Sequence, residues 1–259
     1  MRYTATFLAC LAAAPAAFAQ SAEDLAKQTA NPVANLVSAP FQYNYNSGFG
    51  PDGDGKQSYV NFQPVIPFSL NGNWNLISRT ILPLVWNDGV IPGEDHQFGL
   101  GTTTQSFFLS PKAPTAGGLV WGAGPAFLIP TATDGIADDE WGAGITGVAL
   151  MQTGPWTVGM LGNHLWSVTG DDDISSTFLQ PFLSYTTPAA VSFTLNSEST
   201  YDWVNEEWSV PINGIVSKTT MIGGQAVQFG VGARYWLDSP DAGPDGWGAR
   251  AVVTFLFPE

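Results

Sequence analysis

The residues with the widest catalytic potential in this chain are its two histidines, His96 and His164. Asn163 directly precedes His164 and Ser167 follows it three residues later, which supplies the residue types of a Ser-His-Asn hydrolase. Neighbouring residues of a strand point to opposite faces, so Asn163 and His164 should not meet, and no nucleophile motif stands nearby. His96 lies in an acidic stretch and is expected to be solvated. We therefore expect no enzyme and no catalytic residues, and keep a lipid hydrolase only as the third of three hypotheses.

Acidic clusters are the second group of residues that could do chemistry, because carboxylates bind divalent cations. The stretch Asp52-Gly53-Asp54-Gly55 resembles part of a calcium-binding loop but lacks its full ligand spacing, and Asp171-Asp172-Asp173 is similar. No set of residues has the spacing of a zinc site. We expect solvated charges here, with no metal and no cofactor, and leave divalent-cation binding by the acidic loops open.

The overall charge is strongly negative, with 22 Asp and Glu against 8 Lys and Arg. This balance argues against nucleic acid as a partner, because nucleic-acid binding needs a basic surface. Only 12% of residues are charged, whereas the chain has 29 Gly, 19 Pro and 10 Trp, a composition that is unusual for a soluble domain. No apolar run after the N-terminus reaches 18 residues, so membrane-spanning helices are not expected.

Residues 1–19 have the features of a cleaved signal peptide. Arg2 gives the positive start, residues 7–14 form a short apolar core, and Ala17-Phe18-Ala19 matches the small-residue cleavage pattern. The mature chain should begin at Gln20, which leaves about 240 residues for one large β domain or two small ones. The single cysteine, Cys10, leaves with the signal, so no disulfide is expected. A lipoprotein acylated at Cys10 would have almost no apolar segment before the cysteine.

Most of the remaining chain alternates apolar and polar residues with a period of two. This pattern is typical of strands whose two faces meet different surroundings. In 191–203 the even positions are polar and the odd ones mostly apolar or aromatic, and 225–237 repeats the pattern. We count twelve such segments, to within about two, at 36–47, 58–70, 74–87, 97–110, 118–131, 140–152, 156–168, 175–187, 190–204, 208–219, 225–237 and 246–257.

The connections between these segments alternate between short and long. The short ones contain no Asp or Glu and lie at 71–73, 111–117, 153–155, 188–189 and 222–224. The long ones, with Glu140 at their flank, hold 17 of the 22 carboxylates and lie at 48–57, 88–96, 132–139, 169–174, 205–207 and 238–245. Short turns at one end and longer loops at the other are typical of outer-membrane barrels, whose closure leaves no unpaired edge in lipid.

The predicted fold is therefore all-β: an antiparallel up-and-down transmembrane β-barrel of about twelve strands with a short N-terminal helix. The expected location is the outer membrane of a Gram-negative bacterium, with the acidic loops outside. A soluble β-sandwich also alternates, but its two ends should look alike. Aromatic girdles support the barrel, and the tryptophans at predicted strand ends are Trp74, Trp86, Trp121, Trp141, Trp156, Trp166, Trp203 and Trp208.

If the apolar residues of each alternating strand face lipid, the residues between them face the lumen. The predicted lining of a solute path is Gln63, Asn75, Arg79, Gln180, Asn196, Glu198, Asp202, Asn213, Gln228, Arg234, Arg250, Phe178, Phe182 and Trp236. The same alternation places Gln105 inside. Buried charges need partners, so Glu198 and Asp202 are expected to pair with the arginines.

This lining has two interpretations. The polar network could simply fill or prop the barrel, or it could line a solute path. A mixed polar and apolar lining suits a small hydrophobic or amphipathic solute, and about twelve strands make a narrower barrel than the 16–18 of general porins.

Residues 21–28 differ from the rest of the chain because they favour a helix. Asp24 stands three residues after Ser21, as in a capping box, and Pro32 should end the helical segment. The predicted organisation is a signal peptide at 1–19, a helical segment at 20–35 and a barrel at 36–259. The helical segment could lie in the periplasm or enter the barrel as a plug.

The chain resembles the outer-membrane β-barrel family named for the meta-pathway of phenol degradation, whose members are often labelled "transporter" or "neuromedin U". The stretches that carry the resemblance are AEDLAKQ (22–28), NPVANL (31–36), QPVIPF (63–68), WNLISRT (74–80), FGLG (98–101), SPKAP (110–114), FLIPTAT (127–133) and GARYW (232–236). The resemblance implies a β-barrel that takes up small hydrophobic or aromatic compounds, and no functional residues are carried over from it. Phe257 is followed by two further residues, which sets the terminal aromatic read by the barrel-assembly machinery slightly back from the end.

Three functions are compatible with these observations. The first is a channel or transporter for passive uptake of small solutes, and the second is a structural or surface-interaction barrel with a plugged lumen. The third is the lipid hydrolase. Expected partners are outer-membrane lipid, lipopolysaccharide, the barrel-assembly machinery and an unidentified small solute.

Overall fold

The structure, a computed structural model, describes residues 20–90, 96–137, 140–169 and 173–258. The predicted signal peptide and part of the acidic stretches, including Asp171 and Asp172, lie outside these residues. The elements are α1 (Ala22–Thr29), β1 (Val37–Phe49), β2 (Gly55–Phe62), β3 (Val65–Ser69), β4 (Trp74–Asp88), β5 (His96–Leu100), β6 (Thr103–Pro111), β7 (Leu119–Ile129), β8 (Gly142–Thr153), β9 (Trp156–Ser167), β10 (Ser175–Thr186), β11 (Val191–Ser197), β12 (Ser199–Asp202), β13 (Glu207–Ile222), β14 (Gln225–Asp238) and β15 (Gly246–Phe257).

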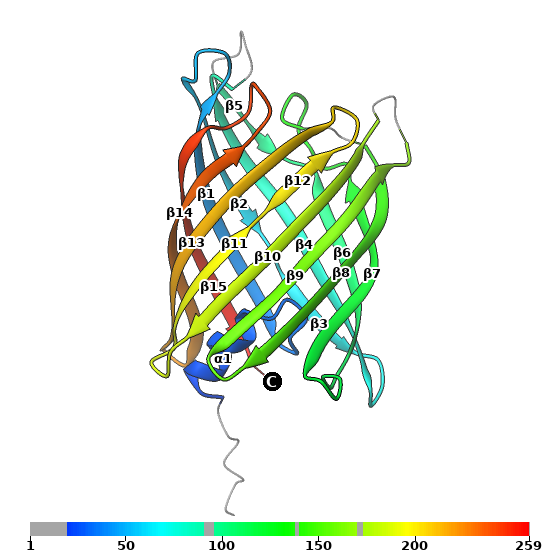
Figure 1. The fold of residues 1–259 in the computed structure, drawn as a ribbon, viewed down its shortest axis with the longest axis vertical. Helices are drawn as coiled ribbons and strands as arrows, with labels where there is room; N and C mark the ends of the chain where they lie inside the picture. Colours follow the sequence, from blue (N-terminus) through cyan, green and yellow to red (C-terminus); the bar gives the residue numbers. More distant parts are fainter. Residues whose placement is uncertain (1–19, 91–95, 138–139, 170–172, 259) are drawn as a thin grey trace, which may run out of the picture.

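The strands form one closed antiparallel barrel of twelve strands (Figure 1). Three of the twelve are each interrupted and carry two labels, namely β2 with β3, β5 with β6, and β11 with β12. The two halves β11 and β12, for example, pair with the same neighbours, β10 and β13, in one unbroken register. The pairing of β1 with β15 and of β9 with β10 closes the ring. The predicted fold class is therefore confirmed.

The two ends of the barrel differ as the connections predict. The turn end carries the short connections, together with α1 and the C-terminus, and the loop end carries the long ones (Figure 1). The Gly223-Gly224 turn between β13 and β14 shows why short turns suffice, since both residues have positive φ, at 56° and 88°. A two-residue turn of this kind matches the twist of paired strands and suits glycine.

The outer face of the barrel is apolar and the inner face largely polar. On β14, Phe229, Val231 and Tyr235 are exposed on the outside, whereas Arg234 between them is buried in the lumen. Among the tryptophans predicted for the girdles, Trp86, Trp141, Trp156, Trp166, Trp203 and Trp208 are exposed, and Trp74 packs edge-on against Trp121. An apolar exterior with an aromatic rim is the surface that a bilayer requires of a barrel. No helix among the described residues is long and apolar enough to cross a membrane.

Gln105 is the exception to the predicted inner face, because it points outward. Its side chain bonds Thr80 Oγ1 and Ser78 Oγ on the exterior of β4, at 2.6 Å and 3.0 Å. The reason is a register change: Leu100 pairs with Leu84, but Thr104 pairs with Ile81, so β6 is displaced by one residue relative to β5. One extra residue in a strand reverses the facing of every residue after it.

Candidate functional site: the polar lumen

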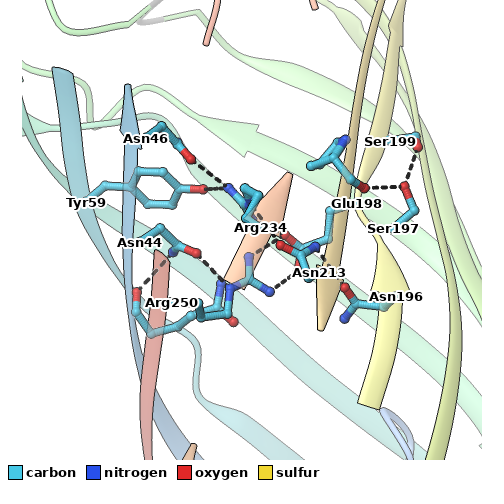
Figure 2. Close-up of polar contacts among 12 residues, drawn as sticks. Asn44, Asn46, Tyr59, Asn196, Ser197, Glu198, Ser199, Asn213, Arg234 and Arg250 are labelled. Atoms are coloured by element: carbon cyan, nitrogen blue, oxygen red, sulfur yellow. Dashed lines mark hydrogen bonds and ion pairs between the residues drawn. The ribbon is translucent and has the colours of Figure 1, made fainter. Parts of the chain in front are cut away.

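An ion-pair network centred on Glu198 occupies the lumen (Figure 2). Glu198 Oε2 lies 2.7 Å from Arg234 Nη2 and 2.6 Å from Arg250 Nη2, and Arg250 Nη1 also donates to Glu198 Oε1 at 2.8 Å. Both arginine side chains are buried, with 3% and 1% of their surface exposed. Two buried guanidinium groups thus share one carboxylate.

Neutral oxygens accept several further guanidinium N–H groups of this network. Arg234 Nε donates to Asn213 Oδ1 at 2.7 Å, and its Nη1 donates to Tyr59 Oη at 2.9 Å. Arg250 Nε donates to Asn44 Oδ1 at 2.8 Å. Buried charges are tolerated when their hydrogen-bonding groups are satisfied in this way. The network therefore holds one side of the barrel wall, from β11 round to β2, in a fixed arrangement.

Strand register brings these residues together from distant parts of the chain. Asn44 on β1 is the direct partner of Arg250 on β15, and Asn213 on β13 is the direct partner of Arg234 on β14. Because residues directly opposite in antiparallel strands face the same side, each arginine enters the lumen beside an amide. Glu198 follows β11 and extends toward both arginines.

Arg79 lies apart from the network. Its Nη2 donates to Gln63 Oε1 at 3.2 Å, and it belongs to none of the ion pairs among the described residues. Glu198 is one negative charge against the three arginines Arg79, Arg234 and Arg250. These four described side chains therefore carry a formal excess of two positive charges, and Arg79 makes no direct ion pair with a described carboxylate.

A cavity of about 250 Å³ lies between the Glu198 network and the turn end. Its lining includes Arg79, seven residues with amide side chains and an apolar part. The amide residues are Gln28, Asn31, Gln42, Gln63, Gln180, Asn196 and Gln228, and the apolar part includes Val65, Phe182, Ile215 and Val252. One water needs roughly 15 Å³, so the cavity has room for a small organic molecule.

The N-terminal segment forms the floor of this cavity. Ser21 caps α1, because its hydroxyl accepts the amide of Asp24 at 3.0 Å. Leu25 is 1% exposed and packs with Leu36 and with Leu256 of β15. Val33 packs farther along, against Phe108 and Ile77 inside the barrel. The segment thus enters the turn end and buries apolar side chains there.

Hydrogen bonds also hold this segment to the barrel wall. Gln152 Nε2 donates to the carbonyl of Lys27 at 3.0 Å, and Gln228 Nε2 donates to Thr29 Oγ1 at 2.9 Å. Asn75 Nδ2 donates to Asn35 Oδ1 at 3.3 Å. The contacts reach three different strands, so the segment is anchored around the opening of the barrel.

Most of the predicted lining residues fall into two groups. The first group meets in the network and consists of Asn213, Glu198, Arg234 and Arg250. Asn213 Nδ2 also donates to Asn196 Oδ1, and the ring of Trp236 lies 5.4 Å from the guanidinium of Arg234. Phe178 packs against the apolar cluster that contains Val33. The members of the predicted set that line the cavity are Gln63, Arg79, Gln180, Phe182, Asn196 and Gln228.

Asp202 corrects the predicted pairing. Its Oδ1 accepts the amides of Val204 and Asn205 at 2.8 Å and 3.2 Å, and its Oδ2 accepts Asn205 Nδ2 at 2.8 Å. The carboxylate is thus used by the tight turn that follows β12. The prediction that Asp202 pairs with an arginine was wrong, because local backbone donors are closer than any charge across the lumen.

Tyr59 and Asn46 are network members that the predicted lining set does not contain, and Asn46 Oδ1 accepts from Arg234 Nη1 at 3.4 Å. Tyr59 lies an even number of residues from Gln63, and Asn46 lies two residues from Asn44, so the alternation alone could have found both. Tyr59 was missed because tyrosine suits an interfacial girdle equally well. The part played by Thr29, Asn35 and Val33 has no periodic signal in the sequence.

The suspected hydrolase residues are not assembled. His164 and Asn163 pair with Thr177 and Phe178 respectively, on opposite faces of β9 and β10. His164 Nδ1 lies 2.6 Å from Thr177 Oγ1 on the outer face, and the hydroxyl of Ser167 instead accepts the amide of Ile174. Within the described ranges, no three His, Cys, Asp or Glu side chains are grouped as a metal site would require.

Comparison with known proteins shows which solved structures share this fold. No family model and no curated protein matches the sequence. An outer membrane channel from Pseudomonas putida F1 is similar in structure, with a TM-score of 0.67 and 14% identity over 86% of this chain and 96% of that one. The outer membrane phospholipase A of Escherichia coli gives 0.51 at 11% identity, over 85% and 90%, and the Salmonella typhi enzyme gives 0.50 at 11%, over 88% and 94%. The fold is that of a twelve-stranded outer-membrane β-barrel.

Proposed function

We propose that this protein is an outer-membrane channel for passive uptake of small solutes, as the first of the three hypotheses holds. The observation that carries the proposal is the cavity inside a closed barrel, lined by Arg79, amides and apolar side chains. The fold shared with the Pseudomonas putida channel supports it, as does the resemblance to the family named for the meta-pathway of phenol degradation. Membership of that family and the signal peptide are part of the proposal.

The solutes that fit best are small molecules with an apolar part. Phe182, Val65 and Val252 line one cavity together with amides, so a fully ionic or large hydrophilic solute would leave apolar wall uncovered. Twelve strands also enclose a narrower lumen than the 16–18 strands of general porins. The mixed lining therefore favours hydrophobic or amphipathic solutes.

The orientation follows from the charge at the two ends. We place the acidic loop end outside the cell, facing lipopolysaccharide, and the turn end with both termini in the periplasm. Outer-membrane lipid would surround the apolar face, and the barrel-assembly machinery would insert the protein, reading the aromatic Phe257 near its end. Nucleic acid has no basic surface to bind here.

The second hypothesis, a structural barrel with a plugged lumen, is favoured by one specific observation. The N-terminal segment buries Leu25 and Val33 inside the turn end and bonds to the wall on several sides. If that segment never moves, no solute passes.

Reconstitution separates the two hypotheses. The purified mature protein is placed in planar bilayers and in liposomes, with liposomes lacking protein as the control. A channel gives discrete conductance steps and faster swelling in small solutes than in large ones. No conductance and no solute-dependent swelling would contradict the channel and leave the plugged barrel.

A further inference from the structure

Arg79 makes no direct ion pair with a carboxylate among the described residues. A guanidinium has five N–H donors in a planar fork, and one of those of Arg79 has an acceptor among the described side chains, Gln63 Oε1. Arg234 and Arg250, on the same lumen wall, bind the carboxylate of Glu198 and several amide or phenol oxygens. Among the described contacts, Arg79 therefore uses fewer of its donors than Arg234 or Arg250 does.

Arg79 lines the cavity and is the charged residue among the described side chains that do so. Water would solvate the guanidinium, but a carboxylate would satisfy it more strongly, because charge-assisted hydrogen bonds are roughly twice as strong as neutral ones. A guanidinium fork also matches the two oxygens of a carboxylate in spacing.

The rest of the wall defines what the carboxylate would be attached to. Gln63, Gln180 and Asn196 offer further amide donors, and Val65, Phe182 and Val252 offer an apolar surface. No second cationic side chain lines the described part of the cavity, so a dianion would be neutralised only in part. The wall therefore matches one negative charge on an apolar body.

We propose that the cavity is a binding site for small monocarboxylates with an apolar body, and that the guanidinium of Arg79 holds their carboxylate. The inference rests on the proposed channel function and names the class of solute that the channel takes. The acidic loops do not oppose this assignment strongly, because exposed charges are screened beyond about 8 Å at physiological ionic strength. The Glu198 carboxylate is already bound by two arginines, so it repels an anion in the cavity less than a free carboxylate would.

The test compares two isosteric probes, sodium benzoate and benzamide, which share the apolar ring and differ in charge. Isothermal titration calorimetry on the purified mature protein in detergent micelles measures each affinity, with empty micelles as the blank. The variants are Arg79→Gln, which removes the charge, and Arg79→Lys, which keeps the charge without the fork. Lys112→Gln is the matched control, because Lys112 is a cation on an exposed turn whose ammonium bonds Ser69.

The wild-type protein should bind benzoate on the order of tenfold more tightly than benzamide, the difference expected for a charge-assisted contact. Arg79→Gln should bring benzoate down to the affinity of benzamide, Arg79→Lys should lie between, and Lys112→Gln should match wild type. Equal affinities for the two probes, no measurable binding of either, or full benzoate affinity in Arg79→Gln would each overturn the site.

Folding of each variant and conductance of the channel are measured in separate experiments. Heat-dependent gel mobility shows whether each variant is a folded barrel. If Arg79→Gln does not fold, Arg79→Lys decides, and an affinity for benzoate equal to that of wild type would overturn the role of the fork. Conductance without discrimination between benzoate and benzamide would contradict this inference alone, whereas benzoate binding without conductance would contradict the channel alone.

Discussion

Arg250 and Glu198 form a two-pronged ion pair across the lumen, with Arg250 Nη1 2.8 Å from Glu198 Oε1 and Arg250 Nη2 2.6 Å from Oε2. The same Oε2 also accepts from Arg234. The carboxylate of Glu198 is therefore the shared anionic partner of two buried guanidinium groups. Removing the carboxylate should cost more than removing most single charges, because it leaves two buried guanidinium groups uncompensated.

Glu198→Gln should destabilise the barrel by about 3 kcal/mol, the order of magnitude expected when one partner of a buried pair is removed. Urea unfolding of the protein in lipid vesicles, followed by tryptophan fluorescence, measures the free energy of unfolding. Glu207→Gln is the control, since Glu207 is an exposed acid at the start of β13, and the stability of this variant should equal that of wild type. A Glu198→Gln barrel as stable as the control would show that the network does not stabilise the fold.

Deletion of residues 21–35 should raise single-channel conductance in planar bilayers. The segment forms the floor of the lumenal cavity, so its removal opens the turn end. Leu25→Asp is a milder form of the same test, because a carboxylate cannot remain in the apolar cluster with Leu36 and Leu256. Glu23→Gln, on the half-exposed face of α1, should leave conductance unchanged. Identical conductance in the deletion and the full chain would mean that the segment does not block the path.

Asp202→Ala should weaken the turn that follows β12 without changing ion selectivity. Asp202 accepts two backbone amides and one side-chain amide of that turn, each a bond worth about 1 kcal/mol. The expected loss is therefore on the order of 1–3 kcal/mol in the free energy of unfolding. Reversal potentials in a salt gradient should match wild type. A changed cation-to-anion permeability ratio would place the charge of Asp202 in the path after all.

The protein should release no fatty acid from phospholipid micelles above the rate of a detergent blank. His164 does contact a hydroxyl, that of Thr177, but Asn163 lies on the opposite face, and Thr177 also accepts from Trp203 Nε1 at 2.8 Å. Among the described contacts, no carboxylate or amide orients the other nitrogen of the His164 ring. Hydrolysis that disappears in both His164→Ala and Thr177→Val would revive the hydrolase hypothesis.

The strands and the facing of their side chains could be predicted because both depend on local periodicity. The segment 225–237 mostly alternates, and β14 spans Gln225–Asp238 with Arg234 inside and Val231 outside. Where one extra residue enters a strand, the periodicity misleads. Gln105 was assigned to the lumen for this reason, since nothing local marks the register change between β5 and β6.

The amino-acid sequence is enough to predict a closed barrel with acidic connections at one end, because bilayer and water impose opposite demands on alternate residues of a strand. It also predicts that three arginines and Glu198 lie on the inner face. The packed structure is needed to show that Glu198 binds Arg234 and Arg250, while Arg79 bonds Gln63 and lines a cavity. It also decided that the N-terminal segment lies inside the turn end. The physical reason is that ion pairing and plugging depend on distances across the lumen, between residues up to about 200 positions apart, which no local pattern encodes.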